Sequence, residues 1–180
     1  MSNTKKPTFA TVWLDGCSGC HMSFIDLDER LLDLADQVDI LISPLVDRKD
    51  YPDFVDIALV EGAVSSDEDE HKIKHIRAHT GTLIAFGDCA VSANVPAMRN
   101  QFKLKDIYDR AYVETADVQP QHPLEVVPRL LPRVRPIQEV VPVDVYLQGC
   151  PPPADVIYYA LTELLAGRTP DFTGRTRPGK

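Results

Sequence analysis

The stretch TFATVWLDGCSGC, residues 8–20, joins an apolar run to two closely spaced cysteines. The run has the length and the β-branched and aromatic content of a strand, and glycines follow it where the chain must turn. Two other apolar runs end in the same way: GTLIAFGD (81–88) leads to Cys89, and VDVYLQG (143–149) leads to Cys150. These are all the cysteines of the chain. Because ligand sites of open parallel sheets form outside the carboxyl ends of the strands, we expect the four thiols to converge there.

Strand and helix patterns alternate through the rest of the sequence, which is typical of an α/β protein. The predicted strands are 8–14, 38–43, 55–60, 82–86 and the run at 143–149, and the predicted helices are 22–36, 65–79, a short one from 91, and 153–167. Strands 38–43 and 55–60 lack polar alternation, so we expect both of their faces to be covered. The sequence predicts a flavodoxin-like, doubly wound, mostly parallel sheet of five strands.

Two of the predicted helices carry more detailed signals. Residues 22–36 place their leucines, including Leu32, on one apolar stripe. Ser65 and Glu68 form the pattern of a capping box before the next helix, and acids fill its first turn. His71, His75 and His79 repeat along that helix, and we interpret them as a solvated surface.

Length and composition limit the organisation and the classes of partner. At 180 residues we expect one domain, residues 1–180, with 101–142 as an irregular, proline-rich connector. The net charge is −8 and no basic face is evident, which argues against a nucleic-acid partner. No apolar run approaches the roughly 20 residues of a membrane span and no signal peptide is recognised, so we expect a cytoplasmic protein with no membrane partner.

The four cysteines admit several interpretations. Structural disulfides are disfavoured in a chain without a secretory leader, and a thioredoxin-like dithiol uses Cys17 and Cys20 but leaves Cys89 and Cys150 unexplained. Structural zinc remains open, although zinc ligands usually come as two closely spaced pairs and here there is one. Four thiolates are also the number that a [4Fe-4S] cluster needs.

Residues next to the cysteines favour the cluster. Gly16, Gly19, Gly87 and Gly149 allow the backbone to approach an inorganic core and to direct N–H groups at sulfur. His21 adjoins Cys20, where it either hydrogen-bonds cluster sulfur or lies exposed in a loop. Glu61 ends the third predicted strand, and either points toward the cluster or caps a helix.

The segments DGCSGCHMSF (15–24), VEGAV (60–64), GTLIAFGDCAVSANVPAMRN (81–100) and GCPPPAD (149–155) resemble the small subunit of cytoplasmic [NiFe] hydrogenases, and most of all those that reduce NAD. The resemblance spans most of residues 8–166 and is weak from 101 to 142. It implies one proximal [4Fe-4S] cluster. The residues that it implies as ligands are Cys17, Cys20, Cys89 and Cys150.

The function implied by the resemblance belongs to a complex, H2 + NAD+ giving NADH + H+, in which this chain transfers electrons and is not catalytic alone. The Ni-Fe centre is then expected on the large subunit, and FMN and NAD on a diaphorase unit. Other hydrogenases, coupled to NADP or a deazaflavin, remain alternatives. So does a complex I-like quinone-site subunit, although that family has adjacent cysteines where Ser18-Gly19 separates the first pair here. A zinc-stapled interaction module is the alternative outside enzymes.

Overall fold

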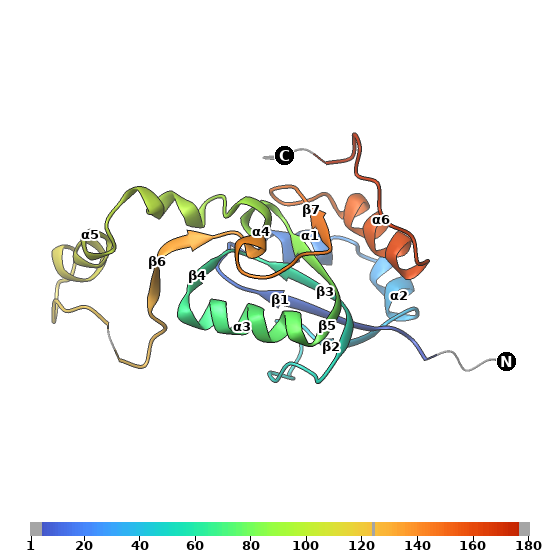
Figure 1. Ribbon diagram of the computed structural model, residues 1–180, viewed down its shortest axis with the longest axis horizontal. Helices are drawn as coiled ribbons and strands as arrows, with labels where there is room; N and C mark the ends of the chain where they lie inside the picture. Colours follow the sequence, from blue (N-terminus) through green and yellow to red (C-terminus); the bar gives the residue numbers. More distant parts are fainter. Residues whose placement is uncertain (1–4, 124, 177–180) are drawn as a thin grey trace.

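The computed structural model describes residues 5–123 and 125–176, and it is built on a parallel sheet (Figure 1). The strand order is β2-β1-β3-β5-β7, and every neighbouring pair is parallel. The strands are β1 (Thr8–Trp13), β2 (Asp39–Ile42), β3 (Val55–Glu61), β5 (Thr80–Phe86) and β7 (Val145–Leu147). Counted in sequence, this is the order 2-1-3-4-5 of flavodoxin-like folds, so the predicted fold class is confirmed.

Helices cover both faces of the sheet (Figure 1). They are α1 (Gly19–Ile25), α2 (Arg30–Ala35), α3 (Asp67–Ala78), α4 (Asp88–Ser92) and α6 (Ala154–Leu165). Alternate residues of β3 show the two sides: Ile57 and Leu59 pack in the core beneath α1 and α6, whereas Val60 packs in the core beneath α3. The central strands are therefore buried on both faces, as their apolar sequences predict.

The strand ends are aligned across the sheet. Trp13 of β1 pairs with Glu61 of β3, Glu61 with Phe86 of β5, and Phe86 with Leu147 of β7. Four strands consequently stop on one row, and the loops that carry the cysteines leave the sheet from the same edge.

Three predictions about local structure were wrong. The single helix expected at 22–36 is two helices, because Asp28 takes a left-handed conformation with φ of 52° between them, and Leu32 is exposed. Strand β2 is not covered on both faces, because it lies at the edge of the sheet and no helix follows it before β3. The capping box of α3 is one residue later than predicted: Ser66 Oγ accepts a hydrogen bond from Asp69 N, and Asp69 Oδ2 accepts one from Ser66 N.

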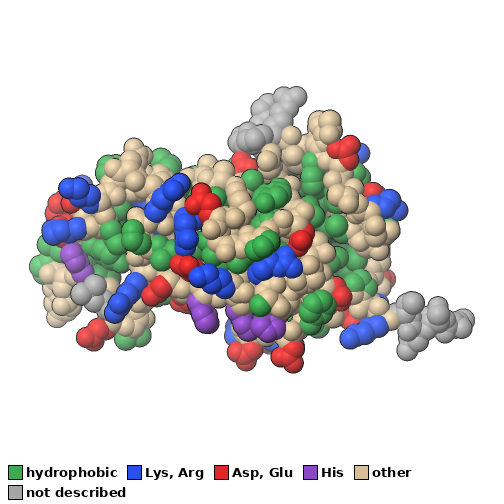
Figure 2. Space-filling model, viewed as in Figure 1, with side chains coloured by type: hydrophobic (Ala, Val, Ile, Leu, Met, Phe, Trp, Pro, Cys, Tyr) green, Lys and Arg blue, Asp and Glu red, His purple; other side chains and the backbone are tan. Residues whose placement is uncertain are grey.

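The segment 101–142 is more ordered than its prolines predict. Strand β6 (Leu130–Arg135) pairs antiparallel with β4 (Val64–Ser66) outside the main sheet. The other elements of this region are η1 (Pro96–Gln101), α5 (Leu104–Asp109), the π-helical turn η2 (Arg110–Glu114) and η3 (Ile137–Glu139). The described residues of 115–129 contain no helix or strand. Hydrophobic side chains gather on the surface at the α5 end (Figure 2), and Phe102 and Tyr112 are among the exposed ones.

Over the part of the chain that the structure describes, none of the helices is both long and apolar enough to span a bilayer.

Thr11 carries a buried hydroxyl in the middle of β1. Its side chain is 2% exposed, and in the described residues its Oγ1 has no hydrogen-bond partner. Thr80 offers a matched comparison, since it is also buried but its Oγ1 donates to Ile76 O at 2.7 Å and pairs with Tyr51 Oη at 2.7 Å.

We expect Thr11→Val to leave the free energy of unfolding unchanged or to raise it by about 1 kcal/mol, since valine removes an unsatisfied polar group and keeps the shape. Thr80→Val should lower it by about 1–2 kcal/mol, because Tyr51 loses a partner. Denaturant unfolding of the full chain measures both. Equal destabilisation by the two substitutions would show that the Thr11 hydroxyl is satisfied in solution.

Candidate metal centre

The four cysteines lie at the aligned carboxyl ends of three strands. Cys17 is in the loop after β1 and Cys20 in the first turn of α1, Cys89 is in α4 directly after β5, and Cys150 follows β7. The thiols are close enough to influence one another: Cys17, Cys89 and Cys150 each raise the pKa of Cys20. The structure therefore brings together the four residues that the sequence singled out.

Burial opposes ionisation of the two inner thiols, those of Cys20 and Cys89. Burial is the main reason that the pKa of Cys20 lies far above its usual value, and Glu61 and the other cysteines add to the shift. Burial likewise raises the pKa of Cys89 to about 11, against a lowering contribution from the backbone of Val95. Buried thiols of this kind become thiolates when a cation compensates the charge. The arrangement can hold metal.

The kind of metal that a site can hold depends on how closely its ligands gather. A single zinc ion needs its ligands within about 2.0–2.3 Å of one point. Among the described residues, no three His, Cys, Asp or Glu side chains are arranged to hold one ion. That finding covers the exposed His71 and His75 of α3 as well as the cysteines. Four cysteines are the number of thiolates that a [4Fe-4S] cluster needs.

Glycines leave the space that the cysteines occupy. Gly87, just before Cys89, has φ of 83°, and a Cβ built there would lie 2.1 Å from Cys20 Sγ. Gly149 has φ of 140° and no room for a side chain against Pro152. The N–H of Gly19 points at Cys17 Sγ, at 3.4 Å between N and S. The approach of the Gly19 N–H to sulfur is of the kind that the glycine pattern predicted, whereas the sequence does not reveal that Gly87 contacts Cys20.

Gly16 has a different neighbour. A Cβ at this position would lie 3.3 Å from Gly62 Cα and 3.7 Å from Glu61 Oε1. The glycine therefore lets the loop before Cys17 pass close to the end of β3.

Glu61 is buried beneath the Cys17–Cys20 loop, with 1% of its surface exposed. Its carboxylate accepts hydrogen bonds from the backbone N–H of Cys20 at 3.3 Å and of His21 at 3.0 Å, and it pairs with His21 Nδ1. The N–H groups at the start of α1 are thus satisfied from β3, since Ser18 makes no side-chain cap. Of the two roles expected for Glu61, this contact supports helix capping.

His21 is not the exposed loop residue considered above. It lies in α1, is 6% exposed, and packs edge-on against Phe86. Its Nε2 has no hydrogen-bond partner within the described ranges of the chain.

Two polar residues escaped the sequence analysis. Asp88 Oδ1 accepts from Gly149 N at 2.8 Å while Asp88 N donates to Gly149 O at 2.9 Å, which fixes the end of β5 to the end of β7. Asn94 Nδ2 lies 3.6 Å from Cys150 Sγ, within hydrogen-bonding range of sulfur. The position of Asp88 next to Cys89 could have marked it as a residue of the site. Nothing in the sequence indicates that Asn94 contacts Cys150.

The group of four cysteines has a buried side and an exposed side. Cys20 and Cys89 are buried, whereas Cys17 and Cys150 are exposed. Two exposed apolar side chains lie near them: Met22 is five residues after Cys17, and Val95 follows Asn94, whose Nδ2 lies 3.6 Å from Cys150 Sγ. The exposed side has the character of a surface that a partner can cover.

Comparison with known proteins identifies the family of the chain. Residues 17–164 match the family described as NADH ubiquinone oxidoreductase, 20 Kd subunit. The chain is 45% identical over 170 residues to the NAD-reducing hydrogenase HoxS subunit delta of Cupriavidus necator, an alignment covering 91% of this chain and 80% of that subunit. It is 32% identical to the iron-sulfur subunit of the F420-non-reducing hydrogenase of Archaeoglobus profundus over 89% of this chain, but spans only 56% of that relative.

Among solved structures, a chain of an NAD+-reducing [NiFe]-hydrogenase in the H2-reduced state superposes with a TM-score of 0.92 and 41% identity. The match covers 96% of this chain and 99% of that one. The chain belongs to the 20 Kd subunit family of NADH ubiquinone oxidoreductase, and within it to the small subunits of NAD-reducing [NiFe] hydrogenases.

Proposed function

We propose that this chain is the electron-transferring small subunit of an NAD-reducing [NiFe] hydrogenase and that it holds one [4Fe-4S] cluster through Cys17, Cys20, Cys89 and Cys150. The observation that carries the proposal is the convergence of four thiols at the aligned carboxyl ends of three strands. The name of the Archaeoglobus relative, which describes it as an iron-sulfur protein, supports the kind of cofactor.

When bound, such a cluster supplies reversible one-electron transfer. The chain's own residues hold the thiolates and compensate their charge. Gly19 N–H donates to Cys17 and Asn94 to Cys150, and hydrogen bonds of this kind stabilise the charged form of sulfur. Glu61 fixes the start of α1 and hence Cys20, and Asp88 fixes Gly149 before Cys150.

The names of similar hydrogenases support assembly into a [NiFe] hydrogenase that reduces NAD, and the assignment of partners rests on the sequence resemblance. In this proposal the Ni-Fe centre lies on a large subunit, FMN and NAD lie on diaphorase subunits, and the complex is cytoplasmic. Exposed Cys17 and Cys150 mark the side at which electrons enter or leave. The matches to F420-non-reducing hydrogenases support a second candidate function. In it, the chain holds the same cluster in a hydrogenase that uses a different electron acceptor.

The first test is the metal content of the protein purified without oxygen. We expect about four irons and four sulfides for this chain. Cys150→Ser should lose most of the cluster and abolish hydrogen-linked NADH formation in the complex, while NADH oxidation by an artificial acceptor at the diaphorase persists. About one zinc and no sulfide in the unaltered chain would contradict the proposal.

Gly87→Ala tests whether the close approach of backbone and sulfur matters. Its Cβ would displace Cys20 Sγ, so we expect less than half the normal iron content. Gly167→Ala is the matched control, because Gly167 also has a positive φ, of 72°, but its Cβ would meet nothing within 4 Å. Similar iron loss in both variants would mean that backbone strain, and not contact with Cys20, is responsible.

Glu61→Gln removes a buried negative charge beside the thiols. Because that charge disfavours adding an electron nearby, the midpoint potential of the cluster should rise by tens of millivolts. For a one-electron couple, a change of about 59 mV corresponds to a tenfold change in the equilibrium constant. A redox titration followed by electron paramagnetic resonance measures the shift, with the exposed Glu125→Gln as control. An unchanged potential with full iron content would show that Glu61 has only a structural role.

A further inference from the structure

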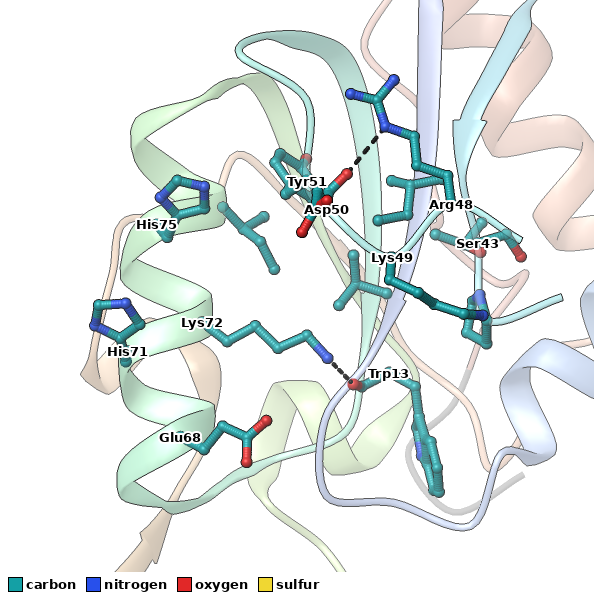
Figure 3. A pocket seen from close by; sticks show the side chains of 15 residues that line it. Trp13, Ser43, Arg48, Lys49, Asp50, Tyr51, Glu68, His71, Lys72 and His75 are labelled. Atoms are coloured by element: carbon teal, nitrogen blue, oxygen red, sulfur yellow. Dashed lines mark hydrogen bonds between the residues drawn. The ribbon is translucent and has the colours of Figure 1, made fainter. Parts of the chain in front are cut away.

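A hollow lies beside β2 on the face of the sheet that α3 covers (Figure 3). Residues 43–54 connect β2 to β3 without a helix, whereas parallel strands are usually joined by one. The part of the sheet beside α3 therefore stays uncovered, and a cavity of about 500 Å3 remains there. Small-molecule sites have volumes of about 300–1,000 Å3. None of the four cysteines lines this cavity.

The walls of the cavity carry cations without carboxylate partners. Arg48 and Lys49 come from the connection between β2 and β3, and Lys72 comes from α3. Each donates to a backbone carbonyl oxygen, and Lys72 Nζ reaches across to Trp13 O at 3.1 Å (Figure 3). Within the described residues, none of the three forms an ion pair. The lining thus holds three cations against the two carboxylates of Asp50 and Glu68, a local excess of positive charge in a chain of net charge −8.

The other side chains that line the cavity can contact a ring of a ligand. Val12, Ile42 and Ile76 supply apolar contacts, and the aromatic rings of Tyr51 and Trp13 are also in the lining. The Tyr51 ring is held in place by the hydrogen bond between its Oη and Thr80 Oγ1.

The cavity also contains acceptors. The carboxylates of Asp50 and Glu68 line it, and both side chains belong to exposed residues. They can accept hydrogen bonds from hydroxyl or amino groups of a ligand. Cations, aromatic rings and a few acceptors together match a ligand that is anionic at one end and planar at the other.

We propose that this cavity binds a small organic phosphate with a planar ring, of the size of a nucleoside monophosphate. Its phosphate lies against Lys49 and Lys72, and its ring packs against Trp13, which lies at the opposite end of the cavity from Tyr51 (Figure 3). This binding site goes beyond the proposed electron transfer and requires no metal.

Isothermal titration calorimetry on the full chain, purified without oxygen, tests the proposal with adenosine monophosphate as the probe. Adenosine and inorganic phosphate are the comparison ligands. We expect adenosine monophosphate to bind more tightly than either, with an affinity that falls as sodium chloride is raised. Absence of saturable binding overturns the proposal, and equally tight binding of inorganic phosphate overturns the part assigned to the ring.

Charge-neutral variants locate the binding. Lys72→Gln and Lys49→Gln should each weaken binding of adenosine monophosphate about tenfold, the size expected for a charge-assisted hydrogen bond. Lys74→Gln is the matched control, because Lys74 lies on the same helix but pairs with Glu70 outside the cavity. Equal weakening by Lys74→Gln would indicate general electrostatic attraction and would overturn the site. Trp13 is the only tryptophan of the chain, so a change in its fluorescence on binding, shifted to about tenfold higher ligand concentration by Lys72→Gln, reports arrival at this cavity.

Discussion

The alignment of four parallel strands is the constraint on which the candidate metal centre depends. Trp13, Glu61, Phe86 and Leu147 form one row across β1, β3, β5 and β7, so the loops beyond them begin at the same level. A shift of one strand by a single residue would turn its side chains to the opposite face and move its cysteine along the sheet. The many buried aliphatic side chains of these strands hold the register, and the position of the thiols is a consequence of that packing.

The sequence predicted the sheet well because central parallel strands are buried on both faces and therefore read as continuous apolar runs. The exposure of the edge strand β2 and the break in the helix expected at 22–36 were not predicted, for a physical reason. Ile40 and Leu32 are apolar but exposed, and apolar content alone cannot distinguish a buried side chain from an uncovered one. Strand β6 was also missed, because its pairing with β4 joins residues about 70 positions apart and its prolines resemble a loop.

For the site, the cysteines could be named from the sequence because a thiol at a strand end is a specific signal. Their supporting contacts could not. Glu61 satisfies the first N–H groups of α1 from a different strand, and Gly87 makes room for a sulfur atom of a different loop. Both contacts exist only after the sheet has formed. Contacts of this kind are determined by tertiary geometry, and local sequence patterns do not predict them.

The unequal burial of the four cysteines has a consequence for how the complex is built. Cys20 and Cys89 lie inside the domain, whereas Cys17 and Cys150 lie at its surface. If a large subunit covers that surface, as the proposed function requires, iron and sulfide reach the inner thiols only while the surface is still open. Maturation then has a fixed order, in which this chain receives its cluster before it docks. A chain that docks first would stay empty.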